Sequence, residues 1–79
     1  MATVPQPPDS NEQFSISFDR ETDGRWIAEI AELPGVLAYG ATKSEAEFKA
    51  IALALRVLAD RTEQAKKPPR SIHFREQLA

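Results

Sequence analysis

Residues 42–61 read TKSEAEFKAIALALRVLADR, and this stretch decides the fold. Thr42 and Glu45 have the spacing of a capping box, in which the threonine hydroxyl accepts a backbone hydrogen bond and the glutamate reaches back. Ala, Leu, Glu, Lys and Arg fill the interior, and neither Gly nor Pro interrupts it. The stretch therefore predicts one long helix from Thr42 to about Arg61.

Apolar residues cover more of this helix than one narrow stripe. One flank is lined by Ala46, Ala50, Leu53 and Val57. A bulkier flank is lined by Phe48, Ile51, Leu55 and Leu58, and Ala54 lies between the two. A helix that is apolar over this much of its circumference is buried on more than one side. A sheet of the same chain covers one side, and either a partner or the chain's own tail covers the other.

The length, net charge and composition of the chain describe a small and nearly neutral domain. The chain has 79 residues, which corresponds to one domain. Its net charge of −2 gives no electrostatic case for binding nucleic acid. Cysteine is absent, which excludes disulfides and thiolate catalysis and agrees with a reducing cytoplasm. No apolar run approaches the roughly 18 residues that a membrane span needs. We therefore expect a cytoplasmic protein.

Two alternating segments precede the helix. Apolar residues recur at every second position in a first strand (Phe14, Ile16, Phe18) and in a second (Trp26, Ala28, Ile30). Between them, residues 19–24 are charged and end in Gly24, which predicts a hairpin. Residues 1–12 are polar and contain three prolines, so we expect a disordered arm at 1–12 and a single domain at 13–79.

A tight turn is predicted at Leu33, Pro34 and Gly35. Pro34 fixes φ for the second position of the turn, and Gly35 takes the positive φ of the third. Short strands follow at residues 36–39 and, after the helix, at 71–75. The order strand, strand, strand, helix, strand predicts an α+β fold in which one helix packs on one face of a single sheet.

The turn and the helix start together resemble a known family. Leu33-Pro34-Gly35-Val36 is followed at a fixed distance by a Gly-x-Thr-x-x-Glu-Ala motif at residues 40–46, and both lie among alternating strands. Over residues 14–60 this resembles the N-terminal domain of HicB antitoxins. The resemblance implies a partial ribonuclease-H-like fold, with three antiparallel strands and a fourth strand beside the first. It also implies oligomerisation and the masking of HicA, a small toxin that cleaves messenger RNA.

The sequence departs from this family in two places. Too few residues follow Pro69 for a DNA-binding domain, so we expect no direct DNA binding. The helix is also more apolar than is usual in the family. We therefore expect the partner-binding surface to be the bulky flank (Phe48, Ile51, Leu55, Leu58), with Asp19 and Asp23 facing a basic toxin. The alternative is a solitary HicB-like module that forms a homo-oligomer, a dimer or larger.

Catalytic chemistry finds little support in the sequence. Asp19, Glu21 and Asp23 crowd one turn, whereas two-metal catalysis needs carboxylates that converge from several elements. His73 is the only histidine and alternates with apolar residues on a terminal strand. We therefore expect a protein that is not an enzyme and that uses no metal and no cofactor.

Overall fold

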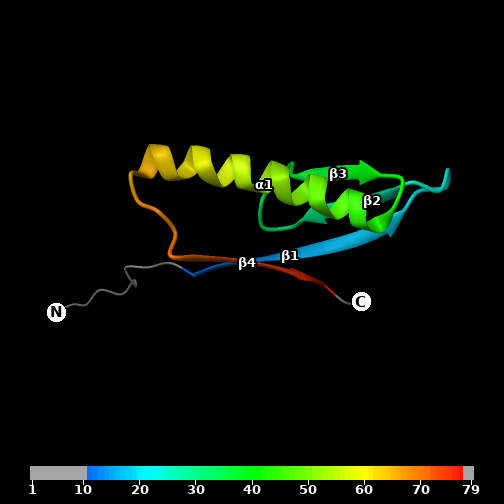
Figure 1. Cartoon of the computed structure of the whole chain (residues 1–79), viewed down its shortest axis with the longest axis horizontal. Coiled ribbons are helices and arrows are strands. Elements are labelled where there is room, and N and C mark those ends of the chain that lie inside the picture. Colours follow the sequence, from blue (N-terminus) through cyan, green and yellow to red (C-terminus); the bar gives the residue numbers. More distant parts are fainter. Residues whose placement is uncertain (1–10, 78–79) are drawn as a thin grey trace.

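The computed structural model describes residues 11–77 (Figure 1). Its elements are β1 (Asn11–Arg20), β2 (Trp26–Ile30), β3 (Leu37–Gly40), α1 (Lys43–Ala65) and β4 (Ser71–Glu76). They form one four-stranded sheet in the order β3-β2-β1-β4, with α1 on one face. β1 pairs antiparallel with β2 and parallel with β4, and β2 pairs antiparallel with β3. The predicted α+β layout is confirmed.

Four predicted boundaries shift, and the smallest shift is at the end of β4, which is Glu76 instead of Arg75. β1 already includes Asn11 and Glu12, because they pair with Ser71 and Ile72 of β4, so the predicted arm at 1–12 extends too far. The rest of that arm and residues 78–79 lie outside the described residues. β3 covers 37–40 instead of 36–39. The helix continues about one turn beyond the predicted end, since nothing breaks it before the left-handed cap at Lys66 and the two prolines that follow.

Both turns form as predicted. Gly35 has φ +86°, and the backbone N–H of Val36 donates to the carbonyl oxygen of Leu33 at 3.0 Å. This is the turn that a proline followed by a glycine favours. In the β1–β2 hairpin Gly24 has φ +94°, and its N–H donates to the carbonyl of Glu21 at 2.9 Å. Glycine adopts such φ values without the steric cost that a Cβ would bring.

The capping box forms with one change. The hydroxyl of Thr42 accepts from the backbone N–H of Glu45 at 3.0 Å, as predicted. The Glu45 carboxylate accepts from the N–H of Ala41 at 2.6 Å, one residue before the cap. Just upstream, β3 passes so close under the first turn of α1 that a Cβ on Gly40 would collide with the backbone of Ala46. The start of the helix is thus held both by hydrogen bonds and by close packing.

The core lies between α1 and the inner face of the sheet. The strands and the turn after β2 contribute the buried residues Phe14, Ile16, Ala28, Ile30, Leu33 and Val36. The helix contributes a row spaced by four residues: Ala46, Ala50, Ala54 and Leu58. The Phe14 ring stacks on Phe74 of β4, with 5.5 Å between centroids. Most of this helix row is alanine, so α1 approaches the sheet closely and the core is thin.

Candidate protein-binding surface

The sheet-facing row of α1 differs from the predicted one. Leu58, which we had placed on the partner-binding flank, is only 7% exposed and belongs to the core. Leu53 and Val57 are half-buried beside the row instead of forming its centre. Four residues turn a helix by about 40° more than one full turn, so an i, i+4 row winds slowly around the axis. A sheet also twists, so it stays in contact with a row that winds in this way. The residues of α1 that are buried against the sheet therefore include Ala54 and Leu58.

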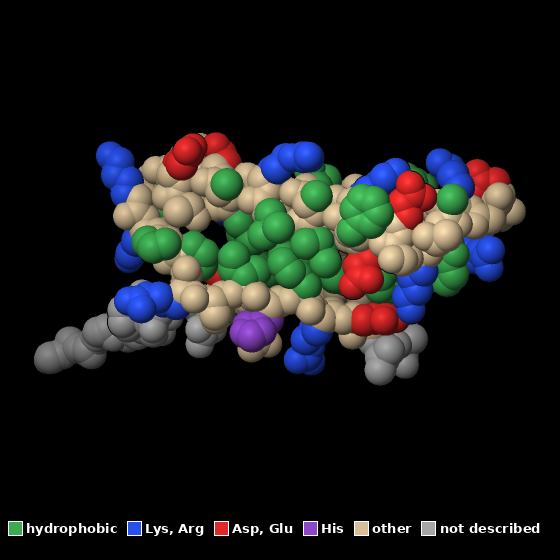
Figure 2. Space-filling view, viewed as in Figure 1, with side chains coloured by type: hydrophobic (Ala, Val, Ile, Leu, Met, Phe, Trp, Pro, Cys, Tyr) green, Lys and Arg blue, Asp and Glu red, His purple; other side chains and the backbone are tan. Residues whose placement is uncertain are grey.

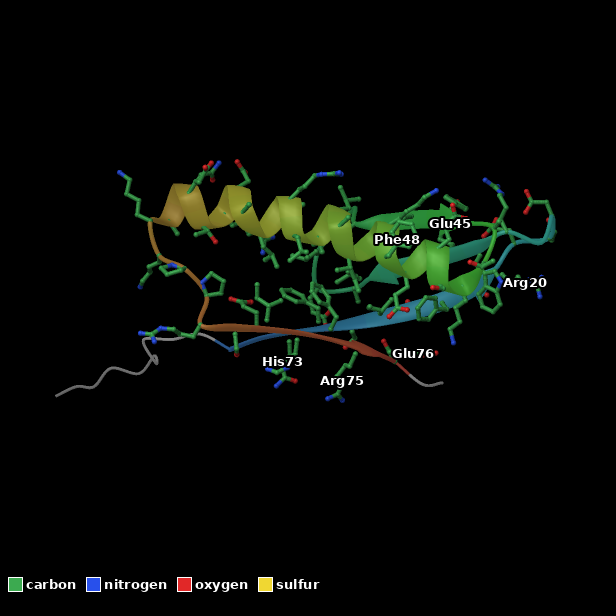
Figure 3. The ribbon with its side chains drawn as sticks, viewed as in Figure 1. Arg20, Glu45, Phe48, His73, Arg75 and Glu76 are labelled. Atoms are coloured by element: carbon green, nitrogen blue, oxygen red, sulfur yellow. The ribbon has the colours of Figure 1, made fainter. Side chains whose placement is uncertain are left out.

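The remaining bulky residues of α1 stay uncovered by the described part of the chain. Phe48 is 61% exposed and Leu55 is 46% exposed, and Ile51 beside them is half-buried. Figure 3 shows Phe48 on the face of α1 that is turned to the viewer. The tail does not cover these side chains, so of the two alternatives left open by the sequence, the covering tail is excluded for residues 11–77.

The sheet adds to this exposed flank. α1 packs mainly across β2 and β3, which leaves the inner face of β4 partly open. The inner-face residues Ile72 and Phe74 of β4 are half-buried. Hydrophobic side chains gather between α1 and β4 in Figure 2. We name the set Phe48, Ile51, Leu55, Ile72 and Phe74 the α1–β4 surface. Sequence reasoning found its helical half but assigned no role to Ile72 and Phe74.

A charged contact borders this surface near the start of α1. The Lys43 ammonium pairs with the Glu76 carboxylate of β4 and lies 4.8 Å from the centre of the Phe18 ring. The Arg20 guanidinium lies 5.2 Å from the centre of the half-buried Trp26 ring. Trp26 therefore packs against the core and also has the cations of Arg20 and Lys43 near its ring. Polar contacts around an apolar centre are the usual composition of a protein interface.

Asp19 and Asp23 lie in the hairpin between β1 and β2, which protrudes at the end of the molecule where α1 begins (Figure 1). The Asp23 carboxylate accepts from the backbone N–H of Arg25 at 3.0 Å and pairs with the Arg25 side chain at 2.8 Å. These contacts, the backbone hydrogen bond first, lower the pKa of Asp23. Asp19 lies in β1 and accepts from the N–H of the next residue, Arg20. The Asp23 carboxylate therefore supports the turn of the hairpin, and Asp19 lies in the strand beside it.

Other carboxylates with shifted pKa values also serve the backbone. Glu32 accepts from the N–H of Ser15 at 2.9 Å, and this hydrogen bond lowers its pKa. The pKa of Glu45 is lowered first by the Ala41 N–H and then by Lys49. A general acid at neutral pH needs a raised pKa, so these shifts point in the opposite direction. Residues 11–77 contain no group of three His, Asp or Glu side chains that could hold a metal ion.

Two further features lie away from the α1–β4 surface. His73 and Arg75 point away from α1 on the outer face of the sheet (Figure 3), where His73 is exposed. A hollow of about 220 Å³ lies where the end of α1 meets the connection to β4 and the start of β1, and Glu12, Arg61, Lys67 and Pro68 are among its lining residues. It is smaller than the roughly 300 Å³ of typical ligand pockets. Neither feature competes with the α1–β4 surface.

Comparison with models of protein families, with curated proteins and with solved structures finds no match. Within residues 11–77, no helix has both the length and the apolar character that crossing a bilayer would take.

Acid is expected to weaken the start of α1. A carboxylate whose folded-state pKa is lowered stabilises the fold above its unfolded-state pKa of roughly 4.3, and this contribution is lost as the pH falls through the folded-state pKa. Glu45 is such a group. We expect Glu45→Gln to lower the urea midpoint at neutral pH, and we expect the difference from wild type to shrink as the pH falls below roughly 4.3 and to vanish below the folded-state pKa of Glu45. A difference that does not depend on pH would show that the charge of Glu45 is irrelevant.

Proposed function

We propose that this chain is a non-catalytic protein-binding module of the HicB antitoxin type, which acts in the cytoplasm and covers a HicA-type toxin with its α1–β4 surface. The observation that carries the proposal is the exposure of Phe48 and Leu55 on a helix whose neighbouring row is fully engaged with the sheet. The strand order and the turn-plus-cap motif agree with the resemblance on which the choice of partner rests.

The chemistry of the surface suits a protein partner. Large apolar side chains at the centre of an interface carry most of its binding energy. Phe48 and Leu55 lie two turns apart on a rigid helix, so little conformational entropy is lost when a partner covers them. Ile72 and Phe74 extend the apolar area onto the sheet. Such an interface needs shape complementarity and no reactive group.

The charge of the chain favours a basic partner. The net charge is −2, and the protruding hairpin contains Asp19, Glu21 and Asp23. Complementary charge mainly accelerates association and contributes less to affinity. Asp19 and Asp23 would then act at long range, since their short-range hydrogen bonds are made within the hairpin.

The test uses the small protein encoded by the neighbouring reading frame. Purified chain is titrated against it, with calorimetry to measure binding and an RNA substrate to measure cleavage. We expect tight binding and loss of cleavage. Phe48→Glu and Leu55→Glu should each weaken binding about 100-fold or more, as replacement of a central interface residue does. His73→Glu, on the opposite face of the sheet, is the matched control and should bind as wild type.

Self-association through the same surface is the competing function. It predicts an oligomer in light scattering of the chain alone, which Leu55→Glu converts to a folded monomer. No binding to the neighbouring protein, together with that conversion, would replace the antitoxin proposal by a solitary homo-oligomer. If Phe48→Glu and Leu55→Glu both bind as wild type, the α1–β4 surface is not the binding site.

A further inference from the structure

β3 has a free edge. The N–H of Ile30 donates to the carbonyl of Val36 at 3.0 Å, and Ala28 pairs with Ala38 in the same register. Hydrogen-bonded pairs alternate along an antiparallel ladder, so Val36, Ala38 and Gly40 direct their backbone groups toward β2. Leu37 and Tyr39 therefore direct theirs away from the sheet, where no strand of the described chain lies.

The free edge of β3 has one usual protection against pairing, its shortness, since β3 has four residues. The other protections of edge strands are charged residues, proline and bulges. β3 reads LAYG and contains none of these three, whereas β4 at the opposite edge contains His73, Arg75 and Glu76. Leu37 and Tyr39 are 37% and 39% exposed. They share the outer face of the sheet, and the Arg25 guanidinium stacks on the Tyr39 ring at 4.5 Å.

We propose that a second copy of this chain pairs antiparallel with β3 about a two-fold axis at Ala38. Leu37 of each copy then faces Tyr39 of the other, and their free backbone groups form reciprocal hydrogen bonds. This pairing also brings the exposed Leu37 and Tyr39 side chains of the two copies together across the β3–β3 interface. This proposal does not depend on the proposed function, because it uses neither Phe48 nor Leu55.

Contact between the two copies of α1 would make the dimer interface larger than the pairing of the β3 strands alone. α1 packs over β2 and β3, so its axis lies close to the free edge. Paired strands lie about 4.8 Å apart. The two copies of α1 would therefore run antiparallel about 10 Å apart, which is the contact distance of packed helices. Ala38, half-buried beneath α1, is small enough to allow this approach.

The side of α1 that would meet its copy is also apolar. Phe48 lies on the face of α1 turned to the viewer in Figure 3, and Leu55, seven residues later, lies on the same side of the helix. Hydrophobic side chains gather between α1 and β4 in Figure 2. By helical spacing, Leu53 and Val57 lie on the opposite side of the buried row from Phe48 and Leu55, and both are half-buried. A second copy of α1 would complete their burial.

The occupant is a second copy and not a foreign peptide. A stable interface takes about 800 Å² from each partner, and the two free residues of β3 are far too short to supply it. An added peptide strand would bring nothing to cover Leu53 and Val57. A second copy brings its own α1, and a two-fold axis satisfies both edges at once.

Cross-linking tests the proposal because the chain contains no cysteine. In a pair centred on Ala38 the two Cα atoms lie about 4.5 Å apart, within the range of a disulfide. We expect Ala38→Cys to give a disulfide-linked dimer under mild oxidation. Leu55→Cys is the matched control and should stay monomeric on a denaturing gel. Cross-linking of Leu55→Cys without cross-linking of Ala38→Cys would overturn the proposal and assign self-association to the α1–β4 surface.

Sedimentation gives a second, independent measurement. We expect wild type to be a dimer at high micromolar concentration. Tyr39→Pro removes an N–H that points away from β2, so the ladder with β2 survives and edge pairing does not. The variant should sediment as a monomer with an unchanged circular dichroism spectrum. A monomeric wild type, or a dimer that survives in folded Tyr39→Pro, would overturn the proposal.

Discussion

A Gly40→Ala variant is expected to lose more than half of its free energy of unfolding. The added Cβ would collide with the backbone nitrogen of Ala46 and lie 2.9 Å from the carbonyl carbon of Glu45. Backbone atoms cannot rotate away as a side chain does, so the first turn of α1 would have to lift from the sheet. Overpacking of a core costs roughly 1–3 kcal/mol, and a clash with backbone belongs at or above the top of that range. A domain this small has about 5 kcal/mol of stability to lose.

Urea denaturation followed by circular dichroism measures this effect. Gly24→Ala is the control, because nothing lies within 4 Å of its added Cβ while its φ of +94° still strains an alanine. The control should cost only about 1 kcal/mol. Gly40 itself has no positive φ, so a loss at Gly40 that is no larger than the loss at Gly24 would show that the close approach of β3 to α1 adds no cost.

Ile30→Ala is expected to cost about 3 kcal/mol. Ile30 has no exposed surface and lies at the centre of the core on β2. Removing a fully buried Ile leaves a cavity as well as the transfer cost, and 2–5 kcal/mol is typical. Leu55→Ala removes an aliphatic side chain of the same size from a position that is 46% exposed. It should cost about 0.5 kcal/mol, as most surface substitutions do.

The contrast between these two variants decides how the α1–β4 surface is understood. Both variants are compared by the shift in urea midpoint at constant slope. If Leu55→Ala destabilises the chain as much as Ile30→Ala, Leu55 is part of the core in solution. The proposed function would then lose the observation that carries it.

Most of the fold follows from local patterns. The alternation around Phe14 and Trp26 places the first two strands, because side chains on a strand point to opposite faces in turn. Gly35 and Thr42 mark a turn and a helix start whose hydrogen bonds depend only on near neighbours. These signals are contained in short windows, so the sequence alone could place the elements and their order.

The surface is only half predictable for a physical reason. Which flank of α1 meets the sheet depends on where the helix lies across the strands, and this is a long-range property. The pattern placed Leu58 on the exposed flank, but a twisted sheet collects an i, i+4 row that includes it. The position of α1 across the strands also decides how far it covers β4. The partial burial of Ile72 and Phe74 therefore depends on that position too.

The parallel pairing of β1 with β4 has a mechanical consequence. Asn11 lies beside Ser71, so both strands run in the same direction from neighbouring starts. A force applied at the first residue of β1 and the last residue of β4 pulls these strands along each other in opposite senses. The hydrogen bonds between them are then loaded together in shear instead of opening one after another. Forced unfolding depends on the unfolding barrier, so this small domain should resist stretching more strongly than its thin core suggests.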